Sequence, residues 1–264
     1  MKVNVNDEYL CAVRTKSFAD FFIQAQLLVN HSHPSINLLL NPPQETIASL
    51  LKSSPHLNSI LSDYFNISAE ASALCAALLQ TLIHLQTNYR SINQIINSRH
   101  HEFLQLAVSG LLDNPFADLN GQDYFQKIHD KHSRVLKRLR KKMAGKLRMI
   151  EFLFSGMRRF GVFKRGSVTR RAADVAAKGA WILKRDFDTM GRLVARIGDE
   201  IEHSRAMMEV CLDRDCLEVL KECEFGVSRQ AEELEEHVYL CLLTINRARA
   251  MVVREICRNS SLHY

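Results

Sequence analysis

Two pairs of acidic and histidine residues are the side chains whose types and spacing could bind a metal ion. Glu200 and His203 stand three residues apart, which is the helical Glu-x-x-His spacing of di-iron bundles. Such a site needs a second pair with the same spacing, whereas Glu233 and His237 stand four apart. Both pairs lie in densely charged stretches, which are typical of solvated helix faces. We therefore expect no bound metal and no other cofactor.

The motifs of nucleophilic, acid–base and phosphate chemistry are missing from the sequence. It contains no Gly-rich phosphate loop, no G-x-S-x-G and no H-E-x-x-H. Seven cysteines are scattered without a C-x-x-C pair, and no apolar leader follows Met1. The sequence therefore predicts a protein that is not an enzyme and that keeps reduced thiols in the cytoplasm.

The strongest chemical signal is a stretch of 41 residues, Lys131 to Arg171, which we call the basic segment. It holds fifteen of the 35 Lys and Arg residues and one acid, Glu151, so it carries about +14 in a chain of net charge +6. A basic block between acidic flanks predicts contact with an anionic surface. The side chains predicted to make this contact are Lys137, Arg138, Arg140, Lys141, Lys142, Lys146, Arg148, Arg158, Arg159, Lys164, Arg165, Arg170 and Arg171.

An anionic membrane is the partner that this composition suits best. Leucines alternate with cations along residues 136–148, and four phenylalanines follow between residues 152 and 163. Each cation near an anionic leaflet contributes about 1 kcal/mol, and inserted phenylalanines add apolar burial. Nucleic acid and calmodulin-like proteins could bind the same composition but rank lower. A further alternative is a solvated helix neutralised by acidic residues of the chain, among them Glu232, Glu233, Glu235 and Glu236.

The first half of the chain is predicted to form short helices broken by loops. All five prolines lie in the first 115 residues. Helices are expected over Tyr9–Asn30, Gln44–Lys52 and His56–Phe65. Ser68 is then expected to cap a longer helix that runs to about Asn97. The apolar stripe of this longer helix is Leu74, Leu78, Leu82, Leu85, Ile92 and Ile96.

The second half is predicted to contain a basic helix, Asp123 to Arg148, and then two long helices. Apolar residues alternate steps of three and four from Ala176 to Met208 and again from Val227 to Val252. This spacing is the seam pattern of coiled coils. Because residues 213–225 lie between the seams, the two helices could fold back as an antiparallel pair. A hairpin within one chain is favoured, and self-association through these C-terminal helices is the alternative.

These elements predict an all-α fold, an elongated helical bundle with a C-terminal antiparallel, coiled-coil-like pair of long helices. The predicted parts are an N-terminal helical region (1–115), a basic helix and connector (116–171) and the long-helix hairpin (172–264). No membrane-spanning helix is expected, because the longest uncharged stretch, Ala71 to Tyr89, contains Gln80, Thr81, His84, Gln86, Thr87 and Asn88.

Four stretches of the chain carry a family resemblance. They are EYLCAVRTKSFADFF (8–22), LSDYFNISAEASALCAALLQTLIHLQTNYRSI (61–92), AAKGAWILKRDFDTMGRLVARIGDEIEHSRAM (176–207) and EELEEHVYLCLLTINRARAMV (232–252). Together they resemble a plant-specific family of uncharacterised helical proteins. The best-known members of that family are integrin-beta-like proteins proposed to link cell wall, plasma membrane and cytoskeleton.

The resemblance implies a helical, membrane-associated protein without catalytic residues. Many members of the family insert a membrane-crossing stretch before the AAKG motif, whereas only 27 residues separate Arg148 from Ala176 here. We therefore expect a non-enzymatic, cytoplasmic adaptor that is peripheral at the plasma membrane. Its expected partners are an anionic membrane surface and proteins, cytoskeletal ones included. A soluble cytosolic interaction module without membrane contact is the alternative.

Overall fold

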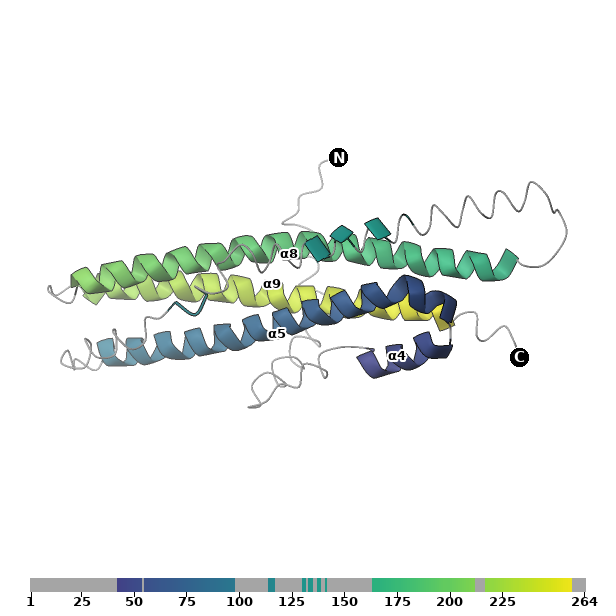
Figure 1. Ribbon diagram of the computed structural model, residues 1–264. Coiled ribbons are helices and arrows are strands. Elements are labelled where there is room, and N and C mark those ends of the chain that lie inside the picture. The colour runs from purple at the N-terminus through teal and green to yellow at the C-terminus, as the bar shows by residue number, and fades with distance from the viewer. Residues whose placement is uncertain are drawn as a thin grey trace, which may run out of the picture. The chain divides into compact units, whose positions relative to one another are not determined.

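Four helices make up most of the part of the chain that the computed structural model describes. They are α4 (Gln44–Ser53), α5 (Pro55–Asn97), α8 (Phe163–Cys211) and α9 (Leu217–Cys257) (Figure 1). These described residues contain no strand, and the prediction of an all-α fold is confirmed. The structure describes residues 42–53, 55–97, 114–116, 163–211 and 217–257, together with residues 130, 131, 133, 134, 137, 138 and 141.

Helix α4 begins where the sequence predicts it, but α5 is longer than predicted. The sequence predicts two helices here, His56–Phe65 and a second one from Ser68 to about Asn97. The structure has a single helix of 43 residues instead. Ser68 is buried inside α5, and its hydroxyl donates a hydrogen bond to the Phe65 carbonyl, 2.8 Å away. Inside a helix a serine hydroxyl can also bond to a carbonyl of the preceding turn, as Ser68 does, so the capping prediction was wrong. The predicted helix at Tyr9–Asn30 lies outside the described residues.

Both predicted seams are buried. From Ala176 to Ser204 on α8, and from Val227 to Val252 on α9, every predicted seam residue is buried. The side chain of Met208, the last residue of the first predicted seam, lies outside the description. Helix α9 nevertheless begins at Leu217, so most of the expected connection at 213–225 is helical. The reason is that Cys223, four residues before Val227, is also buried and continues the apolar face towards the N-terminus.

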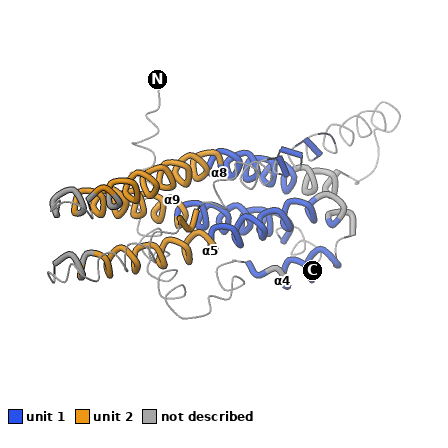
Figure 2. Tube along the Cα trace, turned by 60° about the vertical axis from the view of Figure 1, so that its left-hand side comes forward, with its two compact units in different colours: residues 1–75, 127–187, 240–264 blue, residues 76–126, 188–239 orange. Residues whose placement is uncertain are grey.

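The helices divide into two compact units, and α5, α8 and α9 each supply residues to both (Figure 2). Unit 1 contains residues 1–75, 127–187 and 240–264, and unit 2 contains residues 76–126 and 188–239. This grouping is by contact in space. The predicted contiguous parts (1–115, 116–171 and 172–264) stay a prediction.

Unit 1 is built from α4 and parts of the three long helices, which approach each other closely at Gly179. A Cβ atom at Gly179 would lie 2.9 Å from the Tyr64 hydroxyl oxygen on α5 and 3.0 Å from the Ala248 Cβ on α9. Near the start of α8, the Arg171 Nε lies 3.7 Å from a Glu255 carboxylate oxygen. The residue number therefore rises along α8 as it falls along α9, which makes the pair antiparallel within one chain.

Unit 2 repeats this antiparallel pairing with polar contacts at its edge. Arg196 on α8 pairs with Glu233 on α9. The Gln230 amide donates to the Glu200 carboxylate at 3.0 Å. Helix α5 joins α9 through the Gln86 amide, which donates to the carboxylate of Glu235 at 3.2 Å. Within unit 2 the hairpin interpretation therefore holds, while self-association stays a prediction.

Residues 114–116 also pack against α8 in unit 2. The Asn114 side-chain amide donates to the Gly198 carbonyl at 3.4 Å and to the Glu202 carboxylate at 3.1 Å. Its side-chain oxygen accepts a hydrogen bond from the Phe116 backbone amide at 3.0 Å, and Phe116 is fully buried. This side chain thus stabilises a turn of the chain that covers part of the core.

One helical stretch among the described residues, Leu61–Ile92, is long and apolar enough to cross a membrane by length and composition. The sequence prediction, which considered a shorter stretch, did not identify it. Of its most apolar window, 56% is buried inside the protein. A core helix passes the same test of length and composition, and burial of more than half of the window favours that interpretation.

Candidate anionic-surface site

The structure describes the side chains of four of the thirteen predicted contact residues. Lys137, Arg138, Lys141 and Arg171 are all exposed. Arg138, Lys137 and Lys141 lie in helical residues between 130 and 141, and Arg171 lies in α8. The side chains that lie outside the description are those of Arg140, Lys142, Lys146, Arg148, Arg158, Arg159, Lys164, Arg165 and Arg170.

Five of the six Lys and Arg residues between 131 and 141, those that the structure describes, form what we call the basic strip. A helix turns by about 100° per residue, so these five positions fall within about a third of its circumference and share one face. The strip consists of Lys131, Arg134, Lys137, Arg138 and Lys141.

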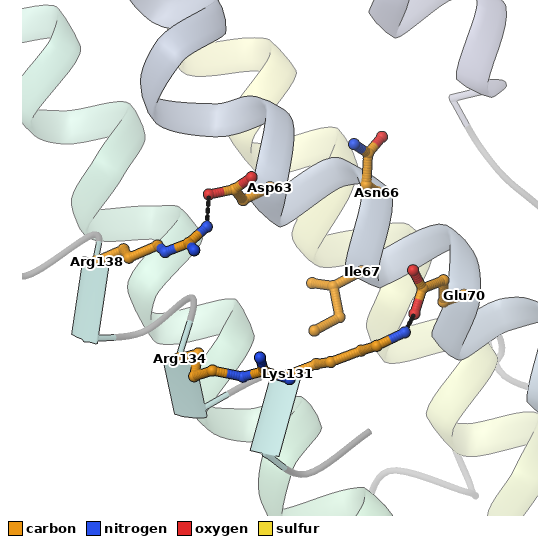
Figure 3. A pocket seen from close by; sticks show the side chains of 7 residues that line it. All are labelled: Asp63, Asn66, Ile67, Glu70, Lys131, Arg134 and Arg138. Carbon is orange, nitrogen blue, oxygen red and sulfur yellow. Dashed lines mark hydrogen bonds and ion pairs between the residues drawn. The ribbon is translucent and has the colours of Figure 1, made fainter. Parts of the chain in front are cut away.

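The basic strip lies against helix α5 in unit 1. The Lys131 Nζ is 2.5 Å from a Glu70 carboxylate oxygen, and the Arg138 Nη1 is 2.8 Å from a carboxylate oxygen of Asp63 (Figure 3). The two cations are seven residues apart, and so are the two acids, in the opposite order. Two helical turns of the strip therefore match two turns of α5, and the strip runs antiparallel to it.

An open pocket of about 290 Å³ lies between the strip and α5. Figure 3 shows the Ile67 side chain between the two ion pairs, with Arg134 on the strip side. The Arg134 Nε donates to the carbonyl of Asp130 at 3.4 Å, one helical turn earlier. Because the ion pairs at Asp63 and Glu70 occupy the ends of the pocket, it is better suited to holding the strip in place than to enclosing a small ligand.

The two ion pairs hold the strip weakly. Their side chains are between 43% and 64% exposed, so solvent screens them. Pairs of this kind contribute about 0.2–1 kcal/mol each. Neither Lys137 nor Lys141, both exposed, forms an ion pair with another described residue. These two lysines therefore present positive charge to solvent.

Within the described part of the basic segment, cations pair with Asp63, Glu70 and Glu255, three acids that were not named from the sequence. Glu233 pairs with Arg196, and Glu235 accepts a hydrogen bond from Gln86, both within unit 2. The acids beside the strip are Asp63 and Glu70 of α5. Their spacing of seven, which equals that of Lys131 and Arg138, was the signal in the sequence that could have found them.

The two metal-ligand pairs considered from the sequence have other surroundings. His203 is exposed, and Glu200 accepts the hydrogen bond from Gln230. Glu233 is engaged by Arg196. Among the residues that the structure describes, no group of three His, Cys, Asp or Glu side chains could hold a metal ion.

A second polar centre, which sequence reasoning missed, is the fully buried Arg249 of α9. Its Nη1 donates to the Phe65 carbonyl at 3.1 Å and to the Ser68 hydroxyl at 2.7 Å, both on α5. Its Nη2 donates to the carbonyl of Pro42, just before α4, at 2.9 Å. The guanidinium also lies over the Phe65 ring, 5.5 Å from its centroid. Arg249 thus joins three segments of unit 1.

Burial explains the electrostatics of this centre. It lowers the pKa of Arg249 to about 10, an effect that the nearby Tyr64 opposes. The guanidinium therefore remains charged at neutral pH. Burial likewise raises the pKa of the Tyr64 hydroxyl, so that group remains neutral. Since Arg249 is fully buried, the centre is structural and cannot contact a membrane or a partner directly.

Two thiols and a carboxyl form a further cluster in unit 1. Cys75 and Cys241 are buried free thiols, and their mutual hydrogen bond together with burial raises the pKa of Cys241. Thiols of raised pKa react slowly. Burial also raises the pKa of Asp186 to about 7, against the opposing effect of Arg185. These groups belong to the packing of the long helices and do not form a reactive site.

Fold and site together define a helical protein of three long, closely packed helices that carries an exposed cationic strip. Comparison with known proteins finds plant proteins that are similar to this chain in sequence. UPF0496 protein At1g20180 of Arabidopsis thaliana is 27% identical over 360 positions, which cover 98% of this chain and 92% of that protein. Putative UPF0496 protein 2 of Oryza sativa subsp. indica is 44% identical over 93 residues, which cover 32% of this chain and 23% of that protein.

The homologues of this chain are therefore plant UPF0496 proteins, and the predicted relation to a plant-specific family is confirmed at that level. The Arabidopsis alignment is longer than the 264 residues of this chain, so that relative contains segments without a counterpart here. No protein-family model matches the chain. No solved structure matches it either.

Proposed function

We propose that this protein is a non-enzymatic, peripheral membrane-associated adaptor whose basic segment contacts an anionic leaflet. The observation that carries the proposal is the exposure of Lys137 and Lys141 on a strip that α5 holds in place. The ion pairs at Asp63 and Glu70 orient the strip, so its remaining cations stand on a defined surface of unit 1.

The energetics of the strip favour a leaflet as its partner. A cation near an anionic membrane contributes about 1 kcal/mol, and several cations add up to a usable affinity without a shaped pocket. The open pocket beside the strip offers little enclosure for a small molecule. A flat, charged partner suits an exposed strip better than a ligand that needs to be surrounded.

In addition to membrane association, we propose a biological role. By resemblance to integrin-beta-like plant proteins, we infer a linker that connects the cytoplasmic face of the plasma membrane to protein partners, cytoskeletal ones included. The names of the relatives state no activity, so this role rests on the resemblance and on the strip.

A soluble interaction module is the second candidate, and one observation favours it. Lys131 and Arg138 already pair with acids of α5, so part of the positive charge is used within the chain. In that case Asp63 and Glu70 would serve only to neutralise the strip, and no membrane contact would follow.

Sedimentation with vesicles separates the two candidates. The protein is mixed with phosphatidylcholine vesicles, or with vesicles that also contain phosphatidylserine, at low salt and at about 0.5 M salt, where the Debye length falls below about 5 Å. The proposal expects binding to the anionic vesicles alone, and loss of that binding in salt. Absence of binding under every condition would leave the soluble module.

Charge reversal then tests the strip itself. The double variant K137E/K141E is expected to lose most of the binding, because four units of charge change on the exposed strip. The matched control is K221E/R229E, which makes the same charge change at two exposed positions of α9 in unit 2. Equal losses in the two variants would indicate a response to net charge and would contradict a contact at the strip.

A further inference from the structure

Helix α8 carries two large apolar side chains on its exposed face in unit 1. Trp181 is 46% exposed and Ile182 is 40% exposed, although Ala180 and Leu183 beside them are fully buried. Neither exposed side chain is needed to complete the core, since the opposite side of α8 forms the seam. Large apolar groups gathered on an exposed surface point to an interaction site.

Cations flank this apolar pair along the same helical face. Lys178 and Arg185, both exposed, stand three residues before Trp181 and three residues after Ile182. The Arg185 guanidinium lies over the indole ring of Trp181, 5.1 Å from the ring centroid. We call these four residues (Lys178, Trp181, Ile182 and Arg185) the Trp181 face.

Helix α9 carries a similar combination on its own exposed side in unit 1. The contacts of Gly179 with Ala248 and of Arg171 with Glu255 set the antiparallel register of the two helices. Met251 is therefore level with residues 175–176 of α8, and it is 47% exposed. Exposed arginines stand on both sides of Met251 along α9, at Arg247 and Arg254.

We propose that the Trp181 face inserts Trp181 and Ile182 into the interfacial layer of an anionic leaflet, with Lys178 and Arg185 beside them. This inference rests on the proposed membrane association and adds the element that enters the lipid. Tryptophan prefers the boundary between headgroups and acyl chains, because its ring is apolar and its N–H is polar. Lysines and arginines beside it attract anionic headgroups.

The cations of the Trp181 face stand closer to the apolar pair than most of the acids on this side of α8. Lys178 and Arg185 are three and four residues from Trp181, whereas Asp174, half-buried, and Asp188, exposed, are each seven residues from it. Asp186, four residues after Ile182, is half-buried, and burial raises its pKa to about 7. Cations one helical turn from a small apolar centre complement anionic lipid. A protein partner would need a larger shaped surface, of roughly 800 Å² on each side, and would rest on more than two apolar anchors of α8.

The sequence supplies a direct reporter, because Trp181 is the only tryptophan of the chain. Its fluorescence is recorded for the full chain alone, with phosphatidylcholine vesicles, and with vesicles that also contain phosphatidylserine. The proposal expects quenching by acrylamide in the free protein. On anionic vesicles it expects a shift of the emission to shorter wavelength and quenching by lipids brominated in the acyl chain.

Two substitutions accompany the spectra. W181A should weaken sedimentation with anionic vesicles by about tenfold, since apolar burial on binding is lost. F225A is the matched control, because Phe225 is 67% exposed on α9 in unit 2 and lies outside the face. It should leave binding unchanged.

The outcomes separate this inference from the proposed function. Binding to anionic vesicles without a spectral shift or bromine quenching overturns the insertion of Trp181 and leaves the proposed function standing. Quenching that persists in K137E/K141E supports the Trp181 face and removes the strip from the contact. An indole that acrylamide cannot reach in the free protein, or no binding to any vesicle, overturns the inference.

Discussion

Units 1 and 2 are built from stretches of the same three long helices, yet their polar contacts differ in kind. In unit 1 a fully buried arginine, Arg249, bonds to two backbone carbonyls and a buried hydroxyl. Among the described residues of unit 2 no charged side chain is buried: the helices are joined by half-exposed polar pairs such as Arg196 with Glu233, and buried polar side chains such as Tyr89 and Ser204 are uncharged. A buried arginine with three acceptors fixes the positions of the segments around it, whereas a half-exposed ion pair allows the two helices to shift relative to each other.

The glycines show the same contrast. A Cβ atom at Gly179 in unit 1 would meet the Tyr64 hydroxyl and the Ala248 Cβ, which belong to packed helices. A Cβ atom at Gly226 in unit 2 would meet only the carboxylate of Glu200, the end of a flexible side chain. The same seam spacing therefore occurs with two kinds of neighbour: closely packed helices at Gly179 in unit 1, and a flexible side chain at Gly226 in unit 2.

The largest effect is expected when Arg249 is removed. R249A would leave a cavity and would remove the guanidinium that donates to the Phe65 and Pro42 carbonyls and to the Ser68 hydroxyl. We expect the free energy of unfolding to fall by about 3–5 kcal/mol, measured by chemical denaturation. The control R247A, two residues away and exposed, should change it by less than about 0.5 kcal/mol. A similar small effect for both variants would show that the buried contacts do not distinguish unit 1.

An intermediate effect is expected from the two glycines. G179A must move α8 away from α5 or α9, so we expect a loss of about 1–2 kcal/mol even though alanine favours a helix. G226A requires that the Glu200 side chain rotate away from Gln230, and the helix propensity of alanine offsets the hydrogen bond that is lost. We therefore expect stability to be unchanged or raised by up to about 1 kcal/mol. Thermal unfolding of both variants measures the difference, and equal losses would refute the contrast between the units.

The smallest effect is expected at the edge of unit 2. E233Q removes the charge that pairs with Arg196, and both side chains are about half exposed, at 51% and 49%. Solvent screens such a pair, so we expect the free energy of unfolding to change by less than about 1 kcal/mol. Chemical denaturation at low and high salt checks this value. If E233Q lowered the free energy of unfolding as much as R249A, the surface pair of unit 2 would contribute as much to stability as the buried arginine of unit 1, and the contrast would be wrong.

The periodicity of the sequence was sufficient to predict the helical class and the two seams of the long helices. Burial of Leu183, Val194, Leu234 and Ile245 follows from steps of three and four residues alone. Helix ends were predicted less well. Ser68 resembled a cap, and the residues after Leu217 resembled a connection, because the same residue types occur inside helices when tertiary contacts satisfy them.

Arg249 shows where the sequence signal was present but was not used. It stands seven residues after Leu242 and seven before Ile256, both buried, so it shares their face of α9. Its charge favoured an exposed position. The carbonyl and hydroxyl partners that permit burial come from Phe65, Ser68 and Pro42, which are far away in the sequence.

What the sequence by itself determined is the set of long amphipathic helices and the concentration of positive charge, since spacing and composition are local properties. Only the tertiary structure decided which charges face solvent and which are bonded. It placed Asp63 and Glu70 beside the basic strip, put Arg249 in the core and left Trp181 exposed. The physical reason is that a helix pattern specifies one buried face, whereas the partner of each polar group depends on the register between helices.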